Sequence, residues 1–252
     1  MIPKTINYCW FGGNPLPEIA EKCINSWKKC CPDYEIKEWN EENFNVYQNR
    51  YCREAFEAKK WAFVSDYARL KIILDHGGVY FDTDNELKKS ISPLISEGIG
   101  FIGFQNEFQV TTGLGFAACK NNRCVREMLS YYEKRGFWEE NREYGLIPCP
   151  IKNTVALKKL GLRTGIEYSK LIQDLDGIRV FPKEYFDPMN YNTRKIEITD
   201  NTYSINHYAD SWNEPQVIQR RKLKKLVPYF ILNLRTQIKS RRDIERYERD
   251  QL

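Results

Sequence analysis

The chain has 252 residues and a mass of 30.0 kDa, which is enough to bury the core of one large domain. Hydrophobic residues make up 42% of it and charged residues 29%, a balance that excludes wholesale disorder. The net charge of +5 is concentrated in residues 216–252, where eleven Lys or Arg face four acids. The remainder therefore has no basic surplus, which argues against nucleic acid as a partner.

Short apolar strands alternate with amphipathic helices along residues 1–215. In chain order, we expect a strand over 4–10, a helix over 17–30, a strand over 34–39, a helix over 55–75, strands over 79–82, 101–104 and 114–119, helices over 122–134 and 154–160, and strands over 178–181 and 203–208. This alternation indicates an α/β domain with a sheet covered on both faces. No Gly-x-Gly-x-x-Gly follows the first strand and no Gly-Lys-Ser/Thr occurs, so dinucleotide and P-loop binding are not expected.

The compartment is predicted from what the sequence lacks. The longest apolar run near a terminus, 227–234, is much shorter than the roughly 20 residues of a membrane-spanning helix. The first residues do not show a charged segment followed by an apolar one, so no signal peptide is expected. Eight dispersed cysteines without a Cys-x-x-Cys are typical of reduced core thiols, which we favour over a zinc site or disulfides. We expect a cytoplasmic protein.

The strongest chemical pattern is Gly-Gly-Val-Tyr-Phe-Asp-Thr-Asp at 77–84. A buried strand would run into Asp82 and Asp84, and their spacing of two would place both side chains on one side. At the carboxyl end of a strand they would face the crevice in which α/β folds bind ligands. Two carboxylates so close favour a Mg²⁺ or Mn²⁺ ion that completes its shell with water and phosphate oxygens. An ordinary acidic turn is the structural alternative.

Two further groups of residues have a structural and a functional interpretation. Asp66 and Arg69 lie three residues apart on a predicted helix, and their spacing alone favours a local ion pair over a sugar-binding pair at the crevice. Near the last strand, His207, Ser211 and Trp212 could supply a metal ligand, a phosphate donor and a lid. Considered alone, they are more typical of a half-buried histidine and a core tryptophan.

The basic tail, residues 216–252, is predicted to form amphipathic helices interrupted at Pro228. We therefore divide the chain into a domain over 1–215 and this tail. Its apolar residues are Leu226, Tyr229, Phe230 and Leu234. They favour equally a helix on an anionic membrane surface and a helix whose apolar side packs on its own domain.

Four of these segments, taken together, resemble glycosyltransferase family 32. They are Ile-Pro-Lys-Thr-Ile-Asn-Tyr-Cys-Trp-Phe-Gly-Gly at 2–13, Ser-Asp-Tyr-Ala-Arg at 65–69, the acidic segment 77–84, and 207–212. The family includes yeast outer-chain mannosyltransferases and bacterial capsule or surface-polysaccharide transferases. The same order is similar to the catalytic domain of the large clostridial glucosylating toxins. The resemblance covers roughly residues 1–215. One departure is Asn7, where the family more often has His.

The resemblance implies a GT-A (Rossmann-like) fold with a mixed central sheet, a Mn²⁺ or Mg²⁺ ion, a nucleotide-sugar donor and a retaining reaction. Asp66, Arg69, Asp82 and Asp84 would be the catalytic residues, with Asp66 and Arg69 gripping the donor sugar. Asp84 and His207 would hold the metal, with Asp82 as a further ligand. The donor would contact Trp10, Phe11, Gly12, Ser65, Tyr80, Thr83, Ser211 and Trp212, of which Trp10 would stack on the base. Thr111, Thr112 and Gly113, in a stretch where relatives often carry Asn, would form a loop lining the sugar or acceptor site.

The function expected from this resemblance is transfer of a hexose, with UDP-galactose favoured over UDP-glucose and UDP-GlcNAc. The acceptor would be a saccharide, such as a lipid-linked oligosaccharide of capsule or surface-polysaccharide synthesis, with the enzyme peripheral at the inner face of the plasma membrane. A non-catalytic membrane or nucleic-acid binder using the tail is one alternative. A metal phosphohydrolase is another, but Glu86 stands where its motif needs Thr or Val.

Overall fold

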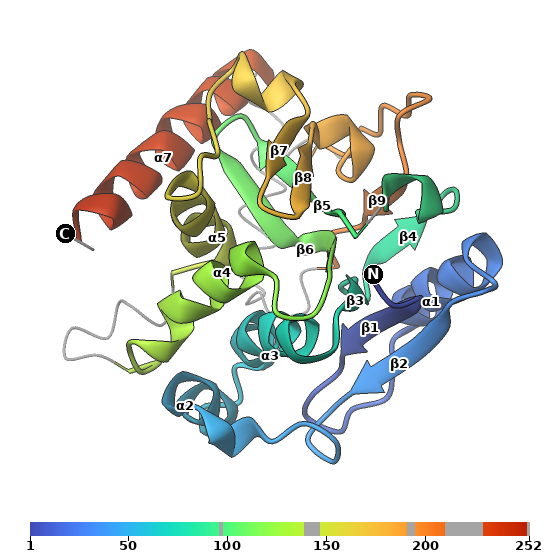
Figure 1. Ribbon diagram of the computed structural model, residues 1–252. Coiled ribbons are helices and arrows are strands. Elements are labelled where there is room, and N and C mark those ends of the chain that lie inside the picture. Colours follow the sequence, from blue (N-terminus) through green and yellow to red (C-terminus); the bar gives the residue numbers. More distant parts are fainter. Residues whose placement is uncertain (96–97, 139–146, 191–194, 210–228, 251–252) are drawn as a thin grey trace.

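The computed structural model describes residues 1–95, 98–138, 147–190, 195–209 and 229–250, and a seven-stranded mixed sheet runs through it (Figure 1). The strand order is β2-β1-β3-β6-β5-β8-β7, with β1 parallel to both β2 and β3 and with β6 antiparallel to its neighbours. The strands are β1 (Thr5–Cys9), β2 (Glu35–Trp39), β3 (Gly78–Tyr80), β5 (Gly100–Asn106), β6 (Gln109–Ala118), β7 (Gln173–Leu175) and β8 (Ile178–Phe181). A separate pair joins β4 (Asn85–Leu87) to β9 (Ser204–Asn206). The mixed α/β fold is confirmed.

Helices and the small sheet cover the two faces of the large sheet, as predicted. The helices are α1 (Glu18–Cys30), α2 (Arg50–Glu57), α3 (Trp61–His76), α4 (Arg123–Glu133), α5 (Cys149–Lys158) and α7 (Tyr229–Arg249). One hydrophobic core lies under α2, α3, α4, α5 and α7. The other lies under α1 and the β4–β9 pair, where the stripe of α1 that ends in Trp27 is buried.

The three strands β1, β2 and β3 are joined by the side chain of Asn7, which is 2% exposed. Its Oδ1 accepts a hydrogen bond from the Trp39 indole N–H at 2.8 Å, and its Nδ2 donates to the Val79 carbonyl at 3.1 Å. Each buried polar atom of the amide thus has a partner, which burial requires. Asn7, which departs from the family pattern, therefore connects β1 to both of its neighbouring strands.

The predicted helix 55–75 is instead two helices, α2 and α3. Lys59 has a φ of 56°, and the N–H of Lys60 donates to the carbonyl of Ala55 at 2.9 Å. The N–H of Lys59 donates to Phe56 at 2.9 Å, which completes the pattern of a Schellman helix end. Glycine usually occupies the left-handed position of that motif. Because Lys59 occupies it here, the end of α2 could not be predicted from the sequence.

The described part of the tail packs on the domain. Leu232, Ile244 and Tyr247 of α7 are buried, and the Tyr131 and Tyr247 rings lie 6.0 Å apart. Leu234 is 55% exposed, while Leu226 and the side chains of Tyr229 and Phe230 fall outside the described residues. The division at residue 215 stays a prediction. Within the described chain, no helix combines the length and the apolar character needed to cross a bilayer.

Candidate functional site

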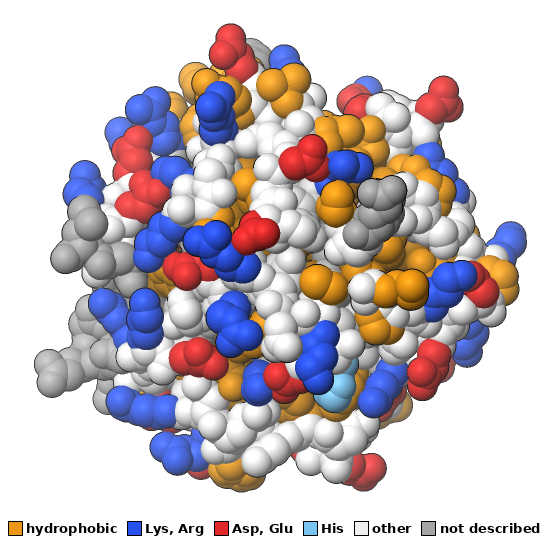
Figure 2. Space-filling view, in the orientation of Figure 1, with side chains coloured by type: hydrophobic (Ala, Val, Ile, Leu, Met, Phe, Trp, Pro, Cys, Tyr) orange, Lys and Arg blue, Asp and Glu red, His pale blue; other side chains and the backbone are white. Residues whose placement is uncertain are grey.

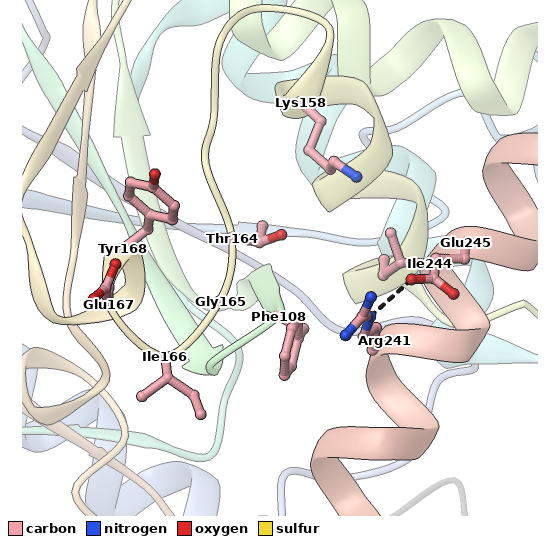
Figure 3. Close-up of a pocket in the computed structure, with 10 residues that line it drawn as sticks. All are labelled: Phe108, Lys158, Thr164, Gly165, Ile166, Glu167, Tyr168, Arg241, Ile244 and Glu245. Atoms are coloured by element: carbon pink, nitrogen blue, oxygen red, sulfur yellow. Dashed lines mark hydrogen bonds and ion pairs between the residues drawn. The ribbon is translucent and has the colours of Figure 1, made fainter.

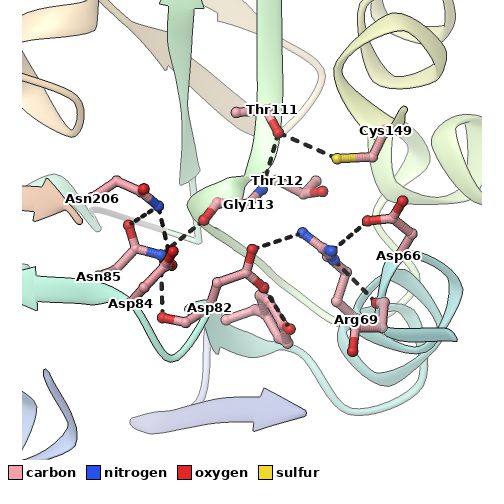
Figure 4. A network of polar contacts seen from close by, with 12 residues as sticks. Asp66, Arg69, Asp82, Asp84, Asn85, Thr111, Thr112, Gly113, Cys149 and Asn206 are labelled. Carbon is pink, nitrogen blue, oxygen red and sulfur yellow. Dashed lines mark hydrogen bonds and ion pairs between the residues drawn. The ribbon is translucent and has the colours of Figure 1, made fainter. Parts of the chain in front are cut away.

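The two predicted carboxylates lie in a turn between the large and the small sheet (Figure 4). The Asn85 N–H donates to the Asp82 carbonyl at 3.0 Å and closes this turn directly after β3. The spacing argument assumed an extended strand, which does not continue through this turn, so the placement of both side chains on one side stays a prediction. Asp82 points toward α3, and Asp84 lies beside β9.

Arg69 is the centre of a buried ionic network. Its side chain is 4% exposed, and its Nη2 donates to Asp66 Oδ1 while its Nη1 lies 3.3 Å from Asp82 Oδ2. The Nε donates to the Ser65 carbonyl at 3.0 Å. Arg69 therefore forms both the local ion pair with Asp66 and a contact with Asp82 in the turn 82–85, which we call the acidic turn. Burial would lower the pKa of Arg69, but Asp82 and Asp66 hold it well above its usual value, so the guanidinium stays charged.

Asp66 is buried, and burial raises the pKa of its carboxyl group. The positive charges of Arg69 and Lys152 oppose this effect. Lys152 belongs to α5, and no sequence pattern pointed to it. Cys149, at the start of the same helix, places its Sγ 3.4 Å from Thr111 Oγ1 and also faces Asp66. Residues of α5 therefore form one side of the site, and this side was not predicted from the sequence.

Asp84 is held by the segment after β9, which is far from it in sequence. Its Oδ1 accepts from Asn206 Nδ2 at 3.2 Å, and its Oδ2 accepts from the Ala209 N–H at 3.0 Å. The His207 N–H donates to the Asp84 carbonyl at 2.9 Å, whereas the His207 Nε2 lies 2.8 Å from Glu86 Oε2. Burial disfavours ionisation of Glu86, but hydrogen bonds from Lys22, His207 and Lys88 outweigh it and lower its pKa to about 2.

Residues 111–113 lie within β6 and not in a separate loop. Pairing of β6 with β5 passes from Thr111 directly to Phe116, so the residues between them bulge from the ladder. The bulge brings Gly113 against the acidic turn, where its carbonyl accepts from Asn85 Nδ2 at 2.8 Å. A Cβ at Gly113 would lie 2.9 Å from Asp82 Oδ2, which explains a glycine at this point.

The remaining predicted donor residues are distributed around this turn. Thr83 is partly exposed, whereas Tyr80 is buried and its hydroxyl donates to Asp82 Oδ1 at 2.9 Å. Phe11 is a core residue, while the half-buried Trp10 donates its indole N–H to the Asn14 carbonyl at 2.6 Å. The last three predicted donor positions are Gly12, whose N–H donates to Glu41, and Ser211 and Trp212, which lie outside the described residues.

Parts of the chain are similar to known glycosyltransferases. Residues 17–99 match the family model described as "Glycosyltransferase sugar-binding region containing DXD motif". An uncharacterized glycosyltransferase of Acanthamoeba polyphaga mimivirus is 26% identical over 216 residues, which cover 82% of each chain. Inositol phosphoceramide mannosyltransferase 1 of Schizosaccharomyces pombe is 27% identical over 124 residues, which cover 44% of this chain and 39% of that protein.

Two solved glycosyltransferase structures are also similar. One is the PaToxG glycosyltransferase, with a TM-score of 0.49 and 21% identity, which covers 63% of this chain and 69% of its own. The other takes part in glycosylation of the major capsid of PBCV-1, with a TM-score of 0.45 and 10% identity over 88% of this chain and 99% of its own. The family and curated matches confirm the expected transferase and its DXD motif.

Proposed function

We propose that this DXD-motif glycosyltransferase moves a hexose from a nucleoside-diphosphate donor to a saccharide acceptor with retention at the anomeric carbon. The observation that carries the proposal is the buried ion pair of Asp66 and Arg69, which Arg69 links to Asp82 beside Asp84, both of them partly exposed. Such a network fixes carboxylates in one orientation before the substrate arrives. Asp66 and Asp82 would then accept hydrogen bonds from sugar and ribose hydroxyls, with Arg69 holding both in place.

A divalent cation fits the donor set at Asp84. Carboxylate oxygens suit Mg²⁺ and Mn²⁺, and Asp84 is partly exposed. Among the described residues, no three His, Cys, Asp or Glu side chains gather as a ready metal cluster. This agrees with an ion that one or two carboxylates share with a diphosphate. Asp84, with Asp82 as a second ligand, would hold it, and it would neutralise charge on the leaving phosphate. Glu86 holds the Nε2 of His207, so a part for His207 in the metal site would fall to its Nδ1.

The reaction needs no protein nucleophile. In the proposed route, the bond between the anomeric carbon and the diphosphate oxygen breaks while a bond to the acceptor oxygen forms on the same face. The departing phosphate oxygen takes the proton of the acceptor hydroxyl, so atoms and charge balance. Asp66 and Asp82 would orient the sugar for this step, which is positioning combined with electrostatic stabilisation.

The donor would be a UDP-hexose, with galactose ahead of glucose and GlcNAc, and the acceptor a lipid-linked oligosaccharide of capsule or surface-polysaccharide type. The yeast relative's name adds a mannose donor as a competitor. To test the reaction, each donor is incubated with Mn²⁺ and the configuration of the released or transferred sugar is followed by NMR. We expect the α-configured donor to give an α-product first. An initial β-product would contradict retention.

A membrane surface as partner is supported by one face of the molecule. Of the large exposed apolar side chains, Ile166, Tyr168, Leu171 and Ile172 fall in one segment, 163–172. This segment and α7 line a hollow of about 460 Å³, in which Phe108 lies between Ile166 and Arg241 (Figure 3). Ile238 of α7, about one helical turn before Arg241, is also exposed. Figure 2 shows hydrophobic side chains beside basic ones at this end of the molecule.

We define the 163–172 face as this segment together with the exposed side of α7. Its exposed charged residues are the bases Arg163, Lys170, Arg235, Lys239, Arg241, Arg242, Arg246 and Arg249 and the acids Glu167 and Glu245, so bases predominate. Apolar side chains among bases are the composition of surfaces that lie on anionic lipid. We propose that the 163–172 face and the tail together hold the enzyme at an anionic bilayer.

Ile172→Glu is expected to weaken sedimentation with phosphatidylglycerol vesicles by about fivefold or more, because it places an acid on the lipid-facing surface. Ile198→Glu serves as the matched control, since Ile198 is also exposed (59%) but lies outside this face. Neither variant should bind pure phosphatidylcholine. Equal binding of the wild type and Ile172→Glu would overturn the membrane partner and leave the transferase proposal untouched. Deleting the tail would be a poor test, because α7 contributes buried core residues.

A further inference from the structure

A lysine is completely buried behind the candidate site. Lys152, on α5, is 0% exposed, and its Nζ lies 4.5 Å from the centre of the Tyr51 ring and 4.2 Å from that of Tyr132. The Nζ also donates to the Tyr51 hydroxyl at 3.3 Å. Two aromatic faces and one hydroxyl stabilise an ammonium in this position. Lysine is almost never fully buried unless it is paired with another group.

The amino-terminal half of α5 borders the sugar-site residues. Next to Lys152, Asn153 donates its Nδ2 to Thr112 Oγ1 at 3.0 Å. One turn earlier, Cys149 contacts Thr111. Asp66 attracts the ammonium of Lys152 through space, and this attraction stabilises both charged forms. The titratable and charged groups around the pair are Arg69 on α3, Cys149 on α5, Tyr132 on α4, Tyr51 on α2 and Asp82 in the acidic turn.

Burying this charge costs stability. Burial lowers the pKa of Lys152 to about 8, even though Asp66 and Cys149 act in the opposite direction. The ammonium is therefore still mostly protonated at pH 7, in a place where α5 otherwise buries Val155, Ala156 and Leu157. An apolar residue of similar length would fill the same space without the desolvation cost. A group that weakens the fold and lies beside a site is a candidate for a functional role.

We propose that Lys152 is a positioning residue that keeps the Asp66 carboxylate ionised and aligned for the donor sugar. Arg69 is shared between Asp66 and Asp82, so one guanidinium faces two carboxylates. Lys152 on α5 supplies a second positive charge that acts on Asp66. The inference rests on the proposed function, because it assigns Asp66 to the sugar.

The first test is thermal stability of Lys152→Met. We expect a higher melting temperature than the wild type at pH 7. The pKa of Lys152 is about 8 in the folded chain and 10.5 as its ordinary value. The loss of stability caused by burying the ammonium is therefore complete below pH 8 and becomes smaller as the pH rises toward 10.5. The gain in melting temperature should therefore shrink between pH 8 and pH 10. A lysine that merely supports the fold would give a lower melting temperature or an unfolded variant, and either result would overturn the proposal.

The second test is the pH dependence of kcat/KM for a nucleotide-sugar donor. Without the ammonium, the pKa of Asp66 rises further, so the acidic limb of the kcat/KM profile should move to higher pH. We expect kcat/KM at pH 6 to fall about tenfold or more, with partial recovery at pH 8. Lys152→Arg keeps the charge and should restore the limb. An unmoved limb in Lys152→Met would overturn the proposal.

Lys159→Met is the matched control. Lys159 lies on the carboxyl-terminal side of α5 beside the Tyr131 ring (4.8 Å) and Glu127, and it is 52% exposed. It should gain no stability and leave the pH profile unchanged. Failure of the proposed function would look different, since the wild type would then process none of the donors while the melting temperatures could still be compared.

Discussion

Arg69→Met is expected to remove at least about 10³-fold of the transferase activity, because it releases both oriented carboxylates at once. Asp66 would lose its closest cation inside the core, and Asp82 would lose its link to α3. Breaking a buried ion pair from one side typically destabilises a protein by about 3–5 kcal/mol. Some of this cost is relieved if Asp66 takes up a proton. Turnover of the donor and urea unfolding measure the two effects.

Arg179→Met is the matched control. Arg179 also pairs with an aspartate, Asp174, at 2.7 Å, but the aspartate side chain is 67% exposed. An exposed pair contributes at most about 1 kcal/mol, so this variant should unfold and react almost like the wild type. Activity of Arg69→Met within about tenfold of the wild type would contradict the role of the network in positioning the donor.

Asp84→Asn is the second substitution with a large expected effect. It should abolish the dependence of donor binding on Mn²⁺ and lower activity by about 10²-fold or more, because an amide is a much weaker ligand for a hard cation. The fold should survive. The new side chain can accept from only one of Asn206 and Ala209, which costs about 1 kcal/mol at this partly exposed position. Donor affinity is measured by calorimetry with and without Mn²⁺.

Asp33→Asn provides the control for removal of a carboxylate. Asp33 pairs with Lys4 at 2.5 Å on the surface, where both side chains are more than half exposed. Its loss should leave Mn²⁺-dependent binding unchanged. Full activity of Asp84→Asn in the presence of a chelator would eliminate the proposed role of the metal.

Six of the seven strands of the large sheet could be predicted because they contain short apolar runs. The strands β7 and β4 were missed, because each is three residues long and mostly polar. The break between α2 and α3 could not be predicted, since it depends on a left-handed lysine where the usual signal is glycine. The bulge in β6 also could not be predicted from the sequence. It follows from mismatched pairing with β5, a relation between strands that no local pattern reveals.

The candidate site was predictable where its residues are near one another in the sequence. The spacing of Asp66 and Arg69 gave their ion pair, and the resemblance indicated that Asp82 lies close to them. Asn206 and Lys152 reach the site only through the fold. A lysine in a helix usually lies at the surface, so its complete burial depends on the Tyr51 and Tyr132 rings that surround it.

The most direct test of the central claim is binding to a panel of UDP-, GDP- and CMP-sugars with and without Mn²⁺, measured by thermal shift and calorimetry. We predict that one nucleotide class, UDP-hexoses first, raises the melting temperature of the wild type only when the metal is present. Asp84→Asn should lose this stabilisation. No stabilisation by any member of the panel, with or without Mn²⁺, would contradict a nucleotide-sugar site at the acidic turn.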